Sequence, residues 1–136
     1  MNYKAPELLL GNGQYDFSID MWSFGCMFAQ VILKKNPIFT GRDIVDQLTK
    51  ISKILGHSDL FEFIADKKIE FPEIDVLKST IGKHPKKPWE KMIDSKNEKL
   101  ATEEALDLIS HLLVYNPDKR FTAKEAKEHA FFSGLD

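Results

Sequence analysis

The sequence predicts an all-α fold, and three observations support this prediction. Apolar residues recur at helical spacing in four segments of the 136-residue chain, residues that cap helices stand at the start of these segments, and no segment alternates apolar and polar residues as a half-buried strand does. A chain of this length forms about one domain with a sizeable core. We therefore expect one helical unit over residues 1–136, with about four main helices and long connecting loops.

The first predicted helix begins at Ser18 as its N-cap and runs to about Leu33. Asp20 falls in its first turn, where a negative charge suits the helix dipole. Apolar residues, among them Trp22, cover most of the circumference of this segment. A helix that is apolar all round is normally enclosed by its own protein, so we expect a central buried helix that ends before Pro37.

A second helix is predicted from Asp43 to Leu55, with one apolar face and with Gly56 as its stop. Residues 57–100 are harder to interpret. We expect short helical pieces around Leu60–Ile64 and then irregular chain rich in lysine. A long irregular segment inside a compact domain is usually functional or mobile.

Two further helices are predicted near the C-terminus. One runs from Thr102, its cap, to Val114, and its apolar residues again fall on one face. The other begins at Thr122, where Glu125 completes a capping box, and ends near Glu128. The two phenylalanines that follow, Phe131 and Phe132, are expected to fold back onto the core.

Composition and charge argue against several classes of function. The net charge is −2 and the pI about 6.1, so no global feature favours nucleic acid or a membrane surface as a partner. The stretch from Ile19 to Leu33 is too short and too polar to span a membrane. The single cysteine, Cys26, permits no internal disulfide, and no signal peptide opens the chain. We therefore expect an intracellular protein of the cytoplasm, the nucleus or both. The four histidines lack zinc-site spacing.

Several motifs occur in a fixed order along the chain. Ala5-Pro6-Glu7 is followed by Asp20-Met21-Trp22-Ser23-Phe24-Gly25, then by Arg120-Phe121-Thr122-Ala123 and by His129-Ala130-Phe131-Phe132. This order resembles the C-terminal half of the large lobe of a eukaryotic protein kinase, over almost the whole chain. The resemblance implies a partial kinase domain over residues 1–136, without the small lobe and the catalytic loop.

The chain is most similar to casein kinase II alpha (catalytic) subunits. The shared segments are the run from Tyr15 to Ser23, Asp46-Gln47-Leu48, Ile54-Leu55-Gly56, the pattern of Lys87, Trp89 and Glu90, and Glu104-Ala105-Leu106-Asp107. The sequence departs from the family at Met1 and Asn2, where the family has arginine and an aromatic residue, at Asn116 and at Ala130.

The resemblance implies roles for five residues. Glu7 and Arg120 would form a buried ion pair that ties the activation segment to the helical base; the alternative is a solvated Arg120. Asp20 would accept backbone hydrogen bonds from the catalytic loop; the alternative is a helix-dipole residue. Trp22 would be structural. Lys4 would attract acidic residues that follow the target Ser or Thr, unless it is only an exposed lysine near the terminus.

The residues that perform phosphoryl transfer are not found in the sequence. Transfer needs a glycine-rich loop, a strand lysine, a catalytic aspartate and a metal-binding aspartate, yet the seven glycines never form G-x-G-x-x-G. The segments His57-Ser58-Asp59-Leu60 and Asp16-Phe17-Ser18 imitate two kinase motifs, but on the wrong side of Ala5-Pro6-Glu7. ATP and magnesium are thus expected in a full-length parent, and this chain alone is expected to be inactive and to hold no cofactor or metal.

Two other interpretations stay open. The chain could be a non-catalytic interaction module that docks protein substrates or partners through the Asp43–Leu55 helix and residues 57–100, or it could have no role of its own. The central helix would also lack the cover that a complete lobe supplies. We therefore expect an exposed apolar patch with residues such as Trp22, Met21 or Phe28, and self-association through it.

Overall fold

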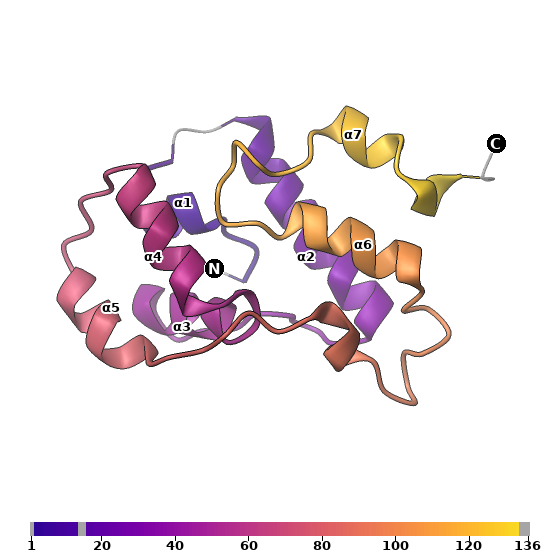
Figure 1. The fold of residues 1–136 in the computed structure, drawn as a ribbon, viewed down its shortest axis with the longest axis horizontal. Coiled ribbons are helices and arrows are strands. Elements are labelled where there is room, and N and C mark those ends of the chain that lie inside the picture. The colour runs from indigo at the N-terminus through magenta and orange to yellow at the C-terminus, as the bar shows by residue number, and fades with distance from the viewer. Residues whose placement is uncertain (1, 14–15, 134–136) are drawn as a thin grey trace.

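The computed structural model describes residues 2–13 and 16–133 and shows an all-helical chain within these ranges (Figure 1). The predicted fold class is therefore confirmed. The described residues form seven α-helices and two short 3₁₀ helices, more than the four main helices expected. They are α1 (Pro6–Leu9), α2 (Phe17–Leu33), α3 (Ile44–Leu55), α4 (His57–Asp66), α5 (Ile74–Ile81), η1 (Trp89–Met92), α6 (Glu103–Leu112), α7 (Ala123–Lys127) and η2 (Ala130–Phe132).

Helix α2 crosses the middle of the molecule and packs against α6 (Figure 1). Gly25 permits this close approach, because a Cβ atom at that position would lie 2.9 Å from Leu112 Cβ and from Leu113 Cδ2. Trp22 lies on a buried face of α2, with no exposed surface, and stacks on Phe39 at a centroid distance of 6.0 Å. The central position predicted for this helix is confirmed.

The N-cap predicted for α2 is wrong by two residues. Asp16, not Ser18, is the cap, because its extended backbone places the carboxylate where Oδ1 accepts the Ser18 N–H at 2.8 Å. Hydrogen bonds from Ser18 hold the pKa of the Asp16 carboxyl below its usual value. Asp20 lies in the first turn, as predicted.

Helix α3 ends at Leu55 before Gly56, as predicted, and it begins at Ile44, because Asp43, the predicted first residue, is its N-cap. Gly56 has a φ of +94°, a backbone conformation that residues with a side chain rarely adopt. This glycine lets α4 start at once after α3. The segment that follows Gly82 then crosses the junction, where His84 O accepts the His57 N–H and Ile54 O accepts the Lys87 N–H, both at 2.8 Å.

The prediction for residues 57–100 is partly wrong, since this segment contains more helix than expected. Helix α4 extends over ten residues, and α5 and η1 were not predicted. Leu77 and Ile81 of α5 are buried against the rest of the core, and α5 packs on α3. Neither α4 nor α5 has a capping side chain. Both helices are therefore stabilised mainly by packing against the core rather than by local interactions.

The two C-terminal helices follow the prediction closely. Thr102 caps α6 and Thr122 caps α7, where Glu125 completes the capping box. Helix α6 ends at Leu112 rather than Val114, because Leu113 leaves the helical conformation with a ψ of 75°. Phe131 folds back as expected and meets Phe28 edge to face at a centroid distance of 4.9 Å.

The face of α2 expected to be uncovered is not the one that the structure exposes. Trp22 is fully buried, Met21 is 9% exposed and Phe28 is partly buried by Phe131. The other side of the helix is open instead, with Phe17 83%, Met27 53% and Val31 65% exposed. Within the described residues, no helix combines the length and the apolar character that a membrane span requires.

Candidate functional site

Glu7 belongs to the single helical turn α1, near the start of the chain. Pro6 takes the first helical position, where its missing N–H is no loss, and Ala5 O accepts the N–H groups of Leu8 and Leu9. This turn directs the carboxylate of Glu7 inward, so that the residue is only 4% exposed.

Arg120 meets this carboxylate from the other end of the chain. Its Nη1 lies 2.9 Å from Glu7 Oε2 and its Nη2 lies 3.0 Å from Oε1, so the pair is bidentate. The Arg120 side chain has no exposed surface, which rules out the solvated alternative. A planar guanidinium matches two carboxylate oxygens in a way that a lysine does not.

The remaining donors of Arg120 are also used. Nη1 donates to Ser18 O at 2.7 Å, Nε and Nη2 donate to Val114 O at 3.2 and 2.9 Å, and Nη2 reaches Tyr115 O at 3.1 Å. The guanidinium carbon also lies 5.3 Å from the centre of the Trp22 ring. One side chain thus joins α1, the start of α2 and the loop after α6.

The other two residues singled out from the sequence lie at the surface. Lys4 is exposed, and it follows Tyr3, whose carbonyl accepts from Ser23 Oγ at 2.9 Å and whose hydroxyl accepts from Gln30 Nε2 at 3.0 Å. Asp20 is exposed in the first turn of α2. The structure therefore brings Glu7, Arg120 and Trp22 together and leaves Lys4 and Asp20 outside this cluster. Tyr15 and Met1, which enter the family comparison, lie outside the described residues.

Asn97 is a buried polar residue that the sequence did not single out. Its Nδ2 donates to Leu33 O at 2.9 Å and to Met92 O at 3.1 Å, and its Oδ1 accepts the Asp94 N–H at 2.9 Å. Asn97 therefore ties the end of α2 to the segment between η1 and α6. The preceding Asp94, whose Oδ1 accepts the Lys96 N–H, forms a turn that the local sequence could have indicated.

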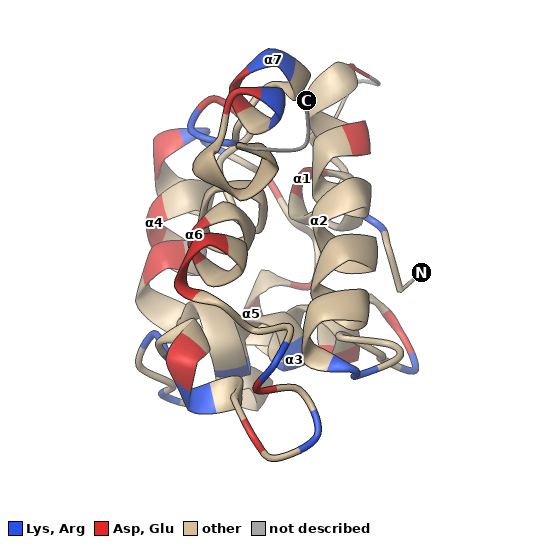
Figure 2. Cartoon of the chain, turned by 90° about the vertical axis from the view of Figure 1, so that its right-hand side faces the viewer, with Lys and Arg blue, Asp and Glu red and all other residues tan. Residues whose placement is uncertain are grey.

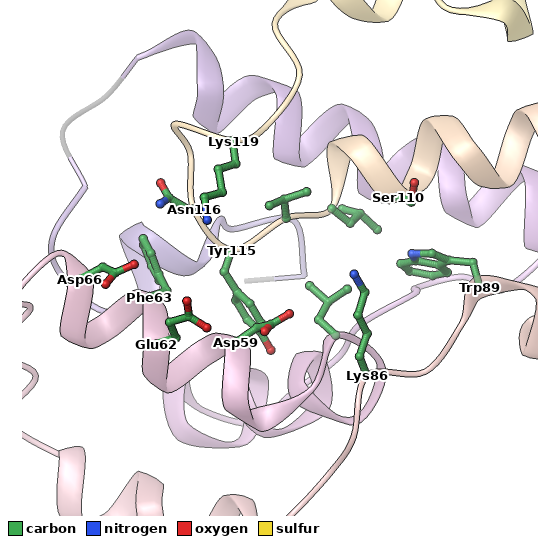
Figure 3. A pocket seen from close by; sticks show the side chains of 13 residues that line it. Asp59, Glu62, Phe63, Asp66, Lys86, Trp89, Ser110, Tyr115, Asn116 and Lys119 are labelled. Atoms are coloured by element: carbon green, nitrogen blue, oxygen red, sulfur yellow. The ribbon is translucent and has the colours of Figure 1, made fainter.

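A groove lies between α4, the end of α6 and the chain around residue 86, and it encloses a volume of about 270 Å³ (Figure 3). Asp59, Glu62 and Asp66 extend from α4 along one side (Figure 3). Lys86 and Lys119 line the groove from other segments. In the part of the chain that the structure describes, no ion pair joins these three acids to either lysine.

The floor of the groove is largely buried and well anchored. Tyr115 OH donates to Gly56 O at 2.9 Å, and Trp89 is 4% exposed. Burial raises the pKa of Tyr115, and the negative charge of Asp59 raises it further, so that this hydroxyl stays protonated. The groove therefore combines a rigid, partly apolar floor with charged rims of both signs.

The described residues offer no group of three or more His, Cys, Asp or Glu side chains placed to hold a metal ion. Cys26 is buried, and burial raises the pKa of its thiol to about 12, so it is not a reactive nucleophile.

Residues 1–132 match the family model described as "Protein kinase domain". The match includes both partners of the buried pair between Glu7 and Arg120. Because it covers nearly the whole chain, this protein belongs to the protein kinase domain family.

Proposed function

We propose that this chain is the C-terminal part of the large lobe of a casein kinase II alpha-like Ser/Thr protein kinase of the cytoplasm or nucleus. The full-length parent would transfer the γ-phosphate of ATP to Ser or Thr in acidic sequences, and this chain would supply the helical base. The observation that carries the proposal is the buried pair of Glu7 and Arg120. Through this pair, α1, which follows Ala5, is held to Arg120 near the other end of the chain, as the resemblance implies.

We also propose that the chain alone transfers no phosphate. Phosphoryl transfer depends on positioned phosphate-binding and metal-binding groups. The two aspartates whose neighbours imitate kinase motifs are placed for other roles, since Asp16 caps α2 and Asp59 lies on the exposed side of α4. The chain therefore serves as a scaffold in this proposal.

The direct test measures thermal unfolding with and without magnesium and ATP, together with phosphate transfer to a serine peptide rich in acidic residues. Ligands that bind the native state raise its melting temperature, so we expect no shift and no transfer. Magnesium alone is the control for effects of the ion. A clear upward shift with ATP, or measurable transfer, would contradict the proposed inactivity.

The acid-directed preference is tested at Lys4. Binding of a fluorescent peptide with acidic residues after a serine should weaken in Lys4→Glu, and less in Lys4→Ala, because each change removes attraction for the acidic residues. Lys96→Glu, an exposed change of the same charge away from α1, is the matched control. Equal binding by all three variants would remove the support for a substrate-side role of Lys4.

The groove beside α4 favours a second candidate function, a non-catalytic interaction module. In this proposal the groove receives a basic peptide segment of a protein partner, with cations along Asp59, Glu62 and Asp66 and an apolar side chain over the floor near Trp89. The three acids stand on one side of α4 at helical spacing (Figure 3), so they match an elongated ligand.

This second candidate is tested with a labelled peptide that alternates arginine and leucine. The triple variant Asp59→Asn/Glu62→Gln/Asp66→Asn should lose most of the binding. The triple variant Glu70→Gln/Asp75→Asn/Glu98→Gln removes the same charge from exposed positions outside the groove and should retain it. Equal losses in both would show general charge attraction, which contradicts a docking role for the groove.

A further inference from the structure

Asn12 and Gly13 lie in the loop that follows α1. Asn12 is exposed, and Gly13 is half-buried and has no side chain that could shield its N–H. Among the described residues, no hydrogen bond engages the Asn12 side chain or the Gly13 N–H, whereas the Asn12 N–H donates to Glu7 O at 2.9 Å. The side-chain amide and the backbone nitrogen that follows it are therefore both free to react with each other.

The other four asparagines of the chain lack this combination. Asn36 and Asn116 precede proline, which has no N–H, and Asn2 precedes a bulky tyrosine. Asn97 has no exposed surface, and its side chain both donates and accepts hydrogen bonds. Of the five asparagines, all of which the structure describes, only Asn12 is exposed and followed by glycine.

We propose that Asn12 is a site of spontaneous deamidation, which replaces its side-chain amide by a carboxylate and weakens the attachment of α1. The Gly13 nitrogen loses its proton to hydroxide and attacks Asn12 Cγ. The N–Cγ bond forms, the Cγ–Nδ2 bond breaks, and the leaving nitrogen takes up a proton from water and departs as ammonia. Water then opens the succinimide ring. Cleavage at Cγ gives aspartate, and cleavage between Asn12 C and Gly13 N gives isoaspartate; no oxidant or reductant takes part.

The new carboxylate changes the surroundings of Glu7. Asn12, Glu7 and Asp16 line one hollow of about 240 Å³, so the product brings a third carboxylate to a place that already has two. Figure 2 shows acidic residues in α1 and in the first turn of α2, on either side of this loop. The isoaspartate form also lengthens the backbone next to the hydrogen bond between Asn12 N–H and Glu7 O. Both products therefore destabilise α1 and the buried pair that Glu7 forms with Arg120.

The reaction is tested by keeping the folded chain in warm, mildly alkaline buffer and then digesting it with trypsin. The peptide Ala5–Lys34 contains Asn12 as its only asparagine. Its mass should increase by the difference between an oxygen atom and an NH group, and part of the product should accept a methyl group from an isoaspartyl methyltransferase. In the variant Asn12→Gln the same peptide should keep its mass, because the longer side chain closes a ring far more slowly.

The other asparagines provide internal controls in the same sample. The tryptic peptides that contain Asn36 and Asn97 should keep their masses, and a sample digested without incubation measures the background. An unchanged native peptide Ala5–Lys34, or an equal increase in mass in Asn12→Gln, would overturn the proposal. An equal increase at Asn97 would also overturn it, because the reaction would then not depend on exposure and a following glycine.

The effect of the product on stability has its own test, which uses the variant Asn12→Asp as the aspartate product. Its unfolding midpoint in urea should be lower than that of the native chain, because the new charge lies beside Glu7. Asn36→Asp is the matched control, since it makes the same change of charge at an exposed position outside the hollow, and it should keep the native midpoint. Equal midpoints for the native chain and both variants would overturn the proposed destabilisation of α1.

Discussion

At the scale of single residues, Arg120 is the side chain on which the most distant parts of the chain converge. It reaches Glu7, which is 113 positions away, and Ser18 O, which is 102 positions away. Its side chain has no exposed surface, and its guanidinium carbon lies 5.3 Å from the centre of the Trp22 ring. A buried charge that has lost its partner is strongly destabilising, so Glu7 and Arg120 depend on each other.

This dependence predicts the effect of Glu7→Gln. The change keeps the shape of the side chain but leaves the guanidinium without its counter-charge, so the free energy of unfolding should fall by about 3–5 kcal/mol in urea titrations. Asp118→Asn is the control. It breaks the more exposed ion pair with Lys67 and should change stability by less than about 1 kcal/mol. A similar decrease in the free energy of unfolding in both variants would mean that burial of the pair between Glu7 and Arg120 does not increase its importance for stability.

At the scale of elements, the contact between α2 and α6 depends on Gly25. By helix propensity alone, Gly25→Ala should stabilise α2 by about 1 kcal/mol. The added Cβ would, however, lie 2.9 Å from Leu112 Cβ, which is shorter than a normal carbon–carbon contact. We expect overpacking to dominate, with a net loss of about 1–2 kcal/mol in the free energy of unfolding. Thr80→Ala on the exposed side of α5 should show the propensity gain alone, and a gain at both positions would contradict the tight α2–α6 contact.

The capping box of α7 predicts a pH dependence. Hydrogen bonds from the backbone and the side chain of Thr122 hold the pKa of Glu125 below its ordinary value of 4.5. Because the pKa is lower in the folded state, the stabilisation is complete above the ordinary pKa and is lost as the pH falls through the folded-state pKa. NMR titration of the Glu125 carboxyl carbon should show this lowered pKa. Thr122→Ala removes the hydroxyl but keeps the backbone N–H that donates to Glu125 Oε1, so it should move the pKa only part of the way back toward 4.5. An unchanged pKa in that variant would exclude the hydroxyl as one of the causes.

The helices that could be predicted from the sequence are those with clear local signals. Helices α3, α6 and α7 combine a side-chain cap, at Asp43, Thr102 and Thr122, with a regular apolar pattern. Helix α5 was missed because it is only eight residues long and has no capping side chain, so its stability comes from packing on α3. The face of α2 was misjudged because an all-apolar helix does not show which side its neighbours cover.

The candidate site could be predicted only in part, because its residues come from segments that are far apart in the sequence. No local pattern joins Glu7 to Arg120; the pairing was expected from the family resemblance. Residues 57–100 were expected as a docking segment and supply Asp59 and Lys86 to the groove beside α4, but its shape was not predicted, because Lys119 and other lining residues come from a separate segment. Asn97 gave no functional signal, since its partners Leu33 O and Met92 O are defined by the fold alone.

At the scale of the whole molecule, long-range hydrogen bonds join parts of the chain that are distant in sequence. Arg120 joins the two ends, Tyr115 OH binds Gly56 O across 59 positions, and Asn97 Nδ2 binds Leu33 O across 64 positions. Most buried apolar residues of these parts belong to one cluster, which includes both Trp22 and Trp89, and a smaller cluster holds Met21, Leu108, Leu112 and Ala126. Helices α2 and α6 contribute residues to both clusters, so we expect the chain to unfold in one cooperative step.

The fluorescence of the two tryptophans tests whether the chain unfolds in one step. Trp22 lies in the centre of the core with no exposed surface, and Trp89 lies beside the groove with 4% exposed. In Trp89→Phe the fluorescence reports on the centre, and in Trp22→Phe it reports on the groove region. Each substitution shifts the overall stability, so the fluorescence midpoint in urea is compared with the circular dichroism midpoint of the same variant. The two midpoints should coincide in both variants, because local opening of either region breaks contacts in the shared core. Loss of Trp89 fluorescence at lower urea than loss of helix would mean that the groove region opens separately, and the single-core interpretation would then be wrong.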